Sequence, residues 1–152
     1  MRTLGSKPMD IDQFRTELEA ALVQELLKHE REFSPYSMQS FDLGIHPWHG
    51  YIEPSFFTTQ DTCGPKEIGD WKLYSFADTK GEKWPQAGHI AKWMQSFYAS
   101  DPQRNAAQLF KAAAEVVTSR SVREALGRYR TTPTFFVSVF NPDDPSFENH
   151  CA

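Results

Sequence analysis

The sequence has few cysteines, no long apolar run and no excess of positive charge. Its two cysteines, Cys63 and Cys151, stand far apart, which fits neither a disulfide framework nor the close spacing of a zinc site. No segment approaches the roughly 18 consecutive apolar residues of a membrane-spanning helix, and residues 1–9 lack the apolar centre of a signal peptide. These absences predict a protein of the reducing cytoplasm with no membrane partner.

The balance of charge and the missing sequence motifs exclude further classes of function. The 16 Lys and Arg residues are outnumbered by 20 Asp and Glu residues, so the net charge of −4 gives no general attraction for nucleic acid. The sequence contains no Gly-x-Gly-x-x-Gly, phosphate-loop or Gly-x-Ser-x-Gly motif. We therefore expect no nucleic-acid partner and no cofactor, and neither a nucleotide enzyme nor a common serine hydrolase.

Aromatic residues, by contrast, are plentiful. The chain of 152 residues contains 12 Phe, 5 Tyr and 4 Trp, and large rings supply much of the energy of a hydrophobic core. A chain of this length is near the commonest size of one domain. We expect a single domain at residues 10–145, after a loose leader at 1–9 and before a C-terminal tail at 146–152.

Apolar residues at helical spacing predict three helices. These helices cover residues 10–32, 90–97 and 102–126. Asp10 with Gln13 has the form of an N-cap and its reciprocal partner, and Asp101 followed by Pro102 is typical of a helix start. Ser121 either opens a new turn or lies within a helix that continues unbroken.

Four strands are predicted, at residues 39–45, 50–58, 71–77 and 134–140. Apolar and polar residues alternate in the first and third, the second follows a glycine-rich connector, and the fourth is aromatic and β-branched between prolines. The first two form a hairpin in this interpretation, and Pro54 indicates an edge strand or a bulge. The strands are grouped rather than alternating with helices, so the predicted class is α+β with a mostly antiparallel sheet of about four strands. The side chains expected to be buried are Phe41, Leu43, Leu73, Phe135 or Phe136, and Val137 or Val139.

Two short stretches carry a resemblance to a known family. Asp-Trp-Lys-Leu-Tyr at residues 70–74 and Phe-Asn-Pro-Asp-Asp at residues 140–144, together with the order of elements, resemble an uncharacterised bacterial domain family associated with polymorphic-toxin immunity proteins. The likeness covers residues 10–144 and leaves the segment around His46 and His49 unmatched. It implies a cytoplasmic α+β domain that binds and blocks a partner protein, with no catalytic residues.

Two groups of residues could carry chemistry and support an alternative function, a small hydrolase. His46 and His49 could share a metal ion if Asp42 or Glu53 supplied oxygen ligands, although a rigid hairpin tip explains the same residues. Cys63, in a glycine-containing turn, could serve as a thiol nucleophile, although no histidine is close in sequence and an ordinary loop cysteine explains it equally.

Our leading interpretation is a non-enzymatic domain that binds another protein, in particular a basic toxin domain. Tryptophan is a frequent anchor of protein interfaces, and carboxylates in loops attract a basic partner. The predicted binding face consists of Trp48, Asp61, Asp70, Asp78 and Trp84. A cluster of arginines at residues 120–130 is interpreted as a solvated helix end that pairs with the acidic first helix.

Overall fold

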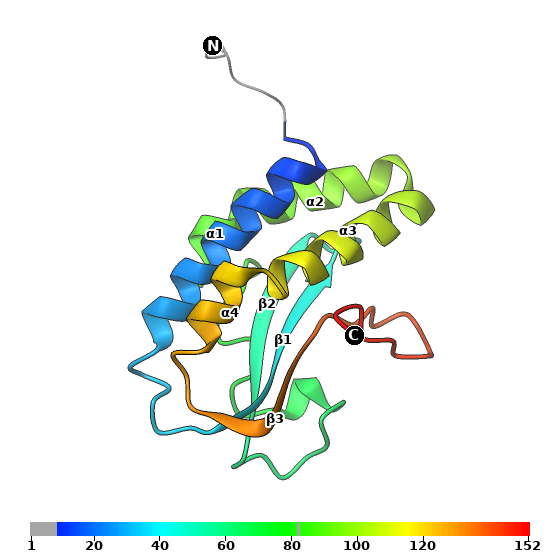
Figure 1. The fold of residues 1–152 in the computed structure, drawn as a ribbon. Helices are drawn as coiled ribbons and strands as arrows, with labels where there is room; N and C mark the ends of the chain where they lie inside the picture. The colour runs from blue at the N-terminus through cyan, green and yellow to red at the C-terminus, as the bar shows by residue number, and fades with distance from the viewer. Residues whose placement is uncertain (1–8, 82) are drawn as a thin grey trace.

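A layer of helices covers one face of a small sheet (Figure 1). The computed structural model describes residues 9–81 and 83–152, so the expected leader lies outside the described residues except for Met9. The elements are α1 (Ile11–His29), β1 (Met38–His46), β2 (Tyr51–Thr58), η1 (Ile68–Asp70), η2 (Pro85–Ala87), α2 (Gly88–Ser100), α3 (Pro102–Val117), α4 (Arg120–Leu126) and β3 (Thr131–Ser138). The predicted α+β class in a single domain is confirmed.

The sheet has three strands in the order β2-β1-β3. The predicted hairpin is confirmed, because β1 and β2 pair antiparallel from Met38 with Thr58 to His46 with Tyr51. β3 pairs parallel to β1, so the sheet is mixed where a mostly antiparallel one was expected. The cause is the connection: the chain leaves β2, passes through the helices and returns in the direction of β1, as parallel neighbours require. Pro54 lies in an edge strand, as expected.

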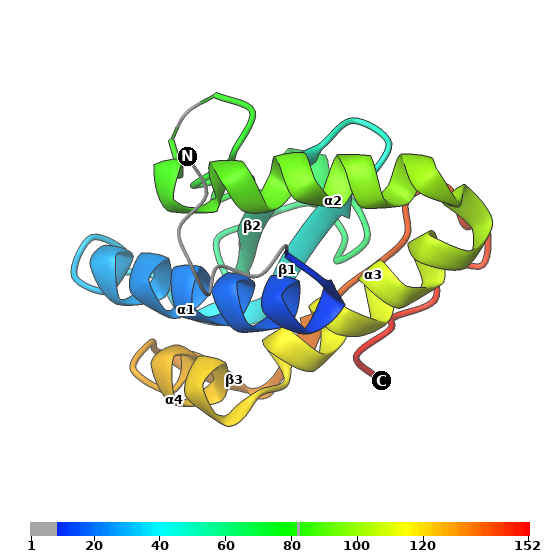
Figure 2. The same ribbon diagram turned by 90° about the horizontal axis from the view of Figure 1, so that it is seen from above.

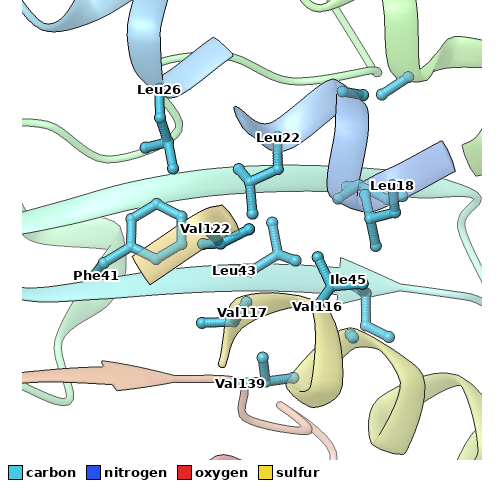
Figure 3. Packing of buried hydrophobic residues seen from close by; sticks show 14 of the residues in the cluster. Leu18, Leu22, Leu26, Phe41, Leu43, Ile45, Val116, Val117, Val122 and Val139 are labelled. Carbon is cyan, nitrogen blue, oxygen red and sulfur yellow. The ribbon is translucent and has the colours of Figure 1, made fainter. Parts of the chain in front are cut away.

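The helices lie over one face of the sheet (Figure 2), and the core forms between them and that face of β1. Leucines of α1 point toward the apolar residues of β1, and valines of α3 and α4 complete the cluster (Figure 3). The labelled members are Leu18, Leu22, Leu26, Phe41, Leu43, Ile45, Val116, Val117, Val122 and Val139. No helix in the described part of the chain is long and apolar enough to cross a bilayer.

The helix ends follow from local capping, with one correction to the number of helices. Asp10 caps α1 as predicted, since its carboxylate accepts a hydrogen bond from the Gln13 N–H at 2.8 Å. The expected third helix is two helices, because the chain leaves helical geometry after Val117 and Ser119 caps α4 through the Val122 N–H. Ser121, which was considered as the start of a new turn, lies inside α4.

The third predicted strand, at residues 71–77, is wrong. Among the described residues this segment makes one isolated bridge to β2, between Phe56 and Leu73. Ser75 then adopts a positive φ of 49°, a conformation that ends any regular strand. The segment instead runs beside β2 as an irregular loop, and the Phe76 N–H donates to the Pro54 carbonyl at 3.2 Å.

Burial agrees with the predicted core in the centre of the sheet and departs from it at the β3 edge. Phe41, Leu43 and Val139 are fully buried. Leu73 is half-buried, and Phe136 is 42% exposed, because β3 has a neighbour on one side only. The C-terminal residues 146–152 fold back on the sheet, where Asn149 bridges to Phe140.

We expect Leu22→Ala to lower the free energy of unfolding by about 2 to 5 kcal/mol, because it leaves a cavity under the sheet. The matched control is Leu27→Ala on the same helix, whose side chain is 47% exposed; its cost should be below about 1 kcal/mol. Urea titration followed by circular dichroism measures both. Equal losses in the two variants would show that the buried face of α1 is wrongly assigned.

Candidate functional site

The face of the sheet that points away from the helices is polar. Because side chains alternate along a strand, Asp42, Gly44 and His46 of β1 lie on the face opposite the core residues. Glu53 of β2 pairs with Gly44 and therefore lies on the same polar face. Ser138 of β3, the partner of Asp42, lies there as well. Three strands thus place polar side chains together.

Two loops close over this face and leave a pocket of about 210 Å³. One loop follows β2 and the other follows β3, so segments far apart in the sequence form the walls. The lining residues are Asp42, Gly44, His46, Glu53, Lys66, Ile68, Gly69, Tyr74, Phe140, Pro142 and Phe147. Carboxylates and an imidazole line the floor, and the walls are largely apolar.

Asp42 is the most deeply buried acid of the pocket, with 4% of its surface exposed. Its Oδ1 accepts a hydrogen bond from the Ser138 hydroxyl at 2.7 Å. Burial raises the pKa of Asp42 from 3.8 to about 7, against the lowering effect of that hydrogen bond, and the charge of Glu53 adds to the rise. Asp42 therefore holds a proton in weakly acidic solution, where an ordinary aspartate is ionised.

Glu53 shares the pocket floor but behaves in the opposite way. Its Oε1 accepts hydrogen bonds from the Tyr74 hydroxyl at 3.0 Å and from His46 Nε2 at 3.2 Å. Burial acts to raise the pKa of Glu53. Hydrogen bonds from His46, Ser75 and Tyr74 outweigh burial, so the pKa of Glu53 stays below its ordinary value. Burial, followed by the charge of Glu53, raises the pKa of Tyr74 to about 12. The floor thus combines an ionised Glu53 with a neutral phenol.

The oxygen of Asp42 that does not bond to Ser138 is open to the pocket. Asp42 Oδ2 has no hydrogen bond to a described residue and is not among the fully buried atoms that lack a partner, so a group entering the pocket can reach it. Glu53 lies beside it on the same face and takes hydrogen bonds from His46 and Tyr74 on Oε1. Two neighbouring carboxyl groups in a mainly apolar pocket offer acceptors to a donor group from outside.

The rim of the pocket is aromatic and locally strained. The rings of Phe140 and Phe147 stack with centroids 4.3 Å apart, and Lys66 Nζ lies 5.5 Å from the centre of the Phe147 ring. Ser75 and Phe147 are the non-glycine residues with positive φ in the described chain, at 49° and 52°. Such strain persists where the surrounding structure holds it, and both residues lie in the loops that close the pocket.

The tryptophans of the predicted binding face are not exposed anchors. Trp84 is fully buried in the core, which corrects its assignment to a surface, because the loop before η2 turns inward to reach α2. Trp48 is half-buried at the hairpin tip, and its ring contacts Tyr98 of α2 edge to face at 6.2 Å. Its carbonyl accepts a hydrogen bond from Gln95. Both rings join elements of the fold.

The three predicted aspartates are also dispersed. Asp61 organises the turn after β2 by accepting hydrogen bonds from the Thr58 and Lys72 N–H groups, both at 2.7 Å. Asp78 is buried and accepts from the Gly81 N–H at 2.5 Å, and Asp70 is exposed at the end of η1. Asp61 and Trp48 flank opposite ends of β2, so the five predicted residues do not form one surface.

The residues of the hydrolase alternative gain no geometric support. His46 bonds to Glu53 and stacks on Tyr51 at 4.2 Å, while His49 is exposed. Within residues 9–81 and 83–152, no three His, Cys, Asp or Glu side chains are grouped to hold a metal ion. Desolvation and the nearby Asp61 raise the pKa of the Cys63 thiol, whereas a nucleophilic cysteine needs a lowered pKa.

From the sequence, Asp42 and Glu53 were predicted only as oxygen ligands of a metal ion. Both carboxylates lie inside predicted strands and not in turns, and acidic residues are rare in strands. That position could have identified them as candidate site residues. Their convergence could not be predicted, because it depends on the register of β1 and β2 and on the parallel return of β3.

Comparison with models of protein families, with curated proteins and with solved structures finds no match for this chain. The interpretation of the pocket therefore rests on its own geometry.

We expect Asp42→Asn to stabilise the protein more at pH 8 than at pH 5. The native state keeps the Asp42 proton up to about pH 7, whereas the unfolded chain loses it near pH 4, so wild-type stability falls as the pH rises between these values. Asparagine has no such proton and can still accept from Ser138. The difference in free energy of unfolding between the variant and the wild type should grow by about 2 to 3 kcal/mol from pH 5 to pH 8. Urea titrations at both pH values measure it, and a constant difference would contradict the burial of an ionisable Asp42.

Proposed function

We propose that this chain is a bacterial cytoplasmic domain that binds a basic partner protein, with the polar-face pocket receiving a cationic side chain of that partner. The observation that carries the proposal is the pair of carboxyl groups, Asp42 and Glu53, that line one pocket, with Asp42 Oδ2 open to it and without a hydrogen bond to a described residue. A basic toxin that is blocked by its immunity protein would be such a partner. The resemblance of residues 70–74 and 140–144 to an uncharacterised bacterial domain family associated with polymorphic-toxin immunity proteins favours that choice.

The size of the pocket favours a side chain over a larger ligand. Pockets for drug-sized molecules measure roughly 300–1,000 Å³, and this one measures about 210 Å³. Protein interfaces concentrate their binding energy in a few side chains that fill such pockets. A single charged group from a partner fits this pattern.

The charge of the pocket favours a cation. Glu53 is ionised, and Asp42 ionises when a positive charge approaches, because an opposite charge stabilises its anionic form. A buried ionised carboxylate is costly when it stands alone and stabilised when it is paired. The net charge of −4 of the whole chain adds a weak long-range attraction for a basic protein.

The same two carboxyl groups support a second function, acid–base hydrolysis. Two carboxyl groups whose pKa values move apart in one site are typical of an acid and base pair. We rank it below binding, because the small pocket leaves little room for a substrate on both sides of a scissile bond. Turnover of a small chromogenic glycoside by the wild type, abolished in Asp42→Asn, would support hydrolysis.

We expect Glu53→Gln to weaken binding of the partner at least tenfold, since it removes the ionised carboxylate of the pocket. The partner is first captured on immobilised wild-type protein from a lysate of the source bacterium and identified by mass spectrometry. Its dissociation constant is then measured with purified wild type and variants at two salt concentrations. Higher salt should weaken binding.

The matched control is Glu124→Gln, which removes an exposed carboxylate on α4 that pairs with Arg120 outside the pocket. It should change the affinity less than twofold. Gly44→Leu tests the pocket by filling it, because a Cβ at Gly44 already lies 3.3 Å from Glu53 Cγ. Thermal midpoints confirm folding of each variant. Equal affinity of the wild type, Glu53→Gln and Gly44→Leu would refute the proposal.

A further inference from the structure

We propose that the group held in this pocket is the guanidinium of an arginine side chain, an inference that rests on the proposed binding function and specifies its chemistry. The positions of the acceptors, the aromatic walls and the charge of the pocket favour a guanidinium over an ammonium.

The acceptors that line the pocket belong to two different carboxyl groups. Asp42 pairs with Ser55 and Gly44 pairs with Glu53, so the two acids are diagonal neighbours on one face, with Cα atoms about 7 to 8 Å apart. A guanidinium is a rigid planar fork with five N–H donors and can bond two separated acceptors at once. An ammonium is a compact point charge, so it satisfies such a pair less well.

Gly44 supplies the space between the two acids. A Cβ at this position would lie 3.3 Å from Glu53 Cγ and 3.5 Å from His46 Nε2, so any side chain here would fill the floor. Asp42 is more than nine-tenths buried and lines the pocket, and its Oδ2 has no hydrogen bond to a described residue. The floor thus combines an open space with a carboxyl oxygen that an entering donor group can reach.

The walls suit the flat faces of a guanidinium. Phe140 and Phe147 line the pocket as a stacked aromatic pair, and a guanidinium stacks on aromatic faces while it donates hydrogen bonds in its plane. Lys66 Nζ lies 5.5 Å from the centre of the Phe147 ring, and its side chain is exposed at the rim. A guanidinium that stacks on Phe147 therefore takes the place of the Lys66 ammonium.

The protonation state of the pocket links binding to pH. The titratable or charged groups that face Asp42 are Glu53, His46, Tyr74, Lys66 and the half-buried Cys151. Burial raises the pKa of the Cys151 thiol to about 12, so this group stays neutral, as does Tyr74. Asp42 holds a proton below about pH 7 and must release it to accept a guanidinium. Binding at pH 6 should therefore release close to one proton.

The test uses two matched probes, the peptides N-acetyl-Gly-Arg-Gly-amide and N-acetyl-Gly-Lys-Gly-amide. Binding to the full chain is measured by NMR chemical-shift titration, and proton release is measured by calorimetry in two buffers of different ionisation enthalpy. We expect the arginine peptide to bind at least tenfold more tightly than the lysine peptide. We also expect release of about one proton at pH 6 and almost none at pH 8.5. Equal affinities, or no difference in proton release between the two pH values, would overturn the inference.

Variants locate the bound peptide. Asp42→Asn and Glu53→Gln should each weaken binding of the arginine peptide at least tenfold. Asp42→Asn should also abolish the release of a proton on binding. Gly44→Leu should block binding by filling the floor, which gives an independent test if a charge variant folds poorly. Glu124→Gln should change nothing. Unchanged affinity in folded Glu53→Gln and Gly44→Leu would overturn the inference.

The partner protein separates this inference from the proposed function. Excess arginine peptide should displace the partner from the wild type, and excess lysine peptide should not. If the pocket variants reduce capture of the partner but neither peptide displaces it, the guanidinium inference is wrong and the proposed binding function is retained. Capture that is unaffected by Gly44→Leu and Glu53→Gln would remove the proposed function as well.

Discussion

The whole structure depends on the burial of β1 on both of its faces. As the central strand it has hydrogen-bonded neighbours on both edges, helices over one face and loops over the other. The helical face is satisfied by the apolar residues Phe41, Leu43 and Ile45. The other face buries Asp42 and Ser40, whose polar groups need partners once water is removed. A strand with one face exposed to water would not create this requirement, because water would bond to its polar groups.

That requirement explains why the floor of the pocket is polar. The Ser138 hydroxyl donates to Asp42, and His46 and Tyr74 bond to Glu53. The raised pKa of Asp42 reflects the cost that burial places on its charge. A cationic donor would supply a further hydrogen bond and the compensating charge together, so the relief of that cost would become part of the binding energy. The stability of the fold and the affinity of the pocket are therefore linked through the same carboxyl group.

Local sequence patterns were sufficient to predict the fold class and most of the helices and strands. They failed where contacts between distant segments determine the structure. The helical spacing of α1 and the alternation of β1 identified these elements, since each places apolar residues on the face that meets the core. The glycine-rich connector identified β2 as the second strand of a hairpin. Residues 71–77 alternate as a strand would, but Ser75 and the contact of Phe76 with Pro54 hold them as a loop. The direction of β3 depends on the helical crossover, which no local pattern encodes. Trp84 looked like a surface anchor in a loop, yet the loop turns inward and buries it.

The central claim is that the two carboxyl groups of the pocket bind a cation. Carbon NMR titration of the Asp42 and Glu53 carboxyl groups between pH 3 and 9 tests it most directly. Without a ligand, Asp42 should titrate near pH 7 and Glu53 below the ordinary range of a glutamate. With saturating N-acetyl-Gly-Arg-Gly-amide, the Asp42 midpoint should fall by at least one pH unit. Ordinary midpoints for both groups, unmoved by the peptide, would contradict the claim.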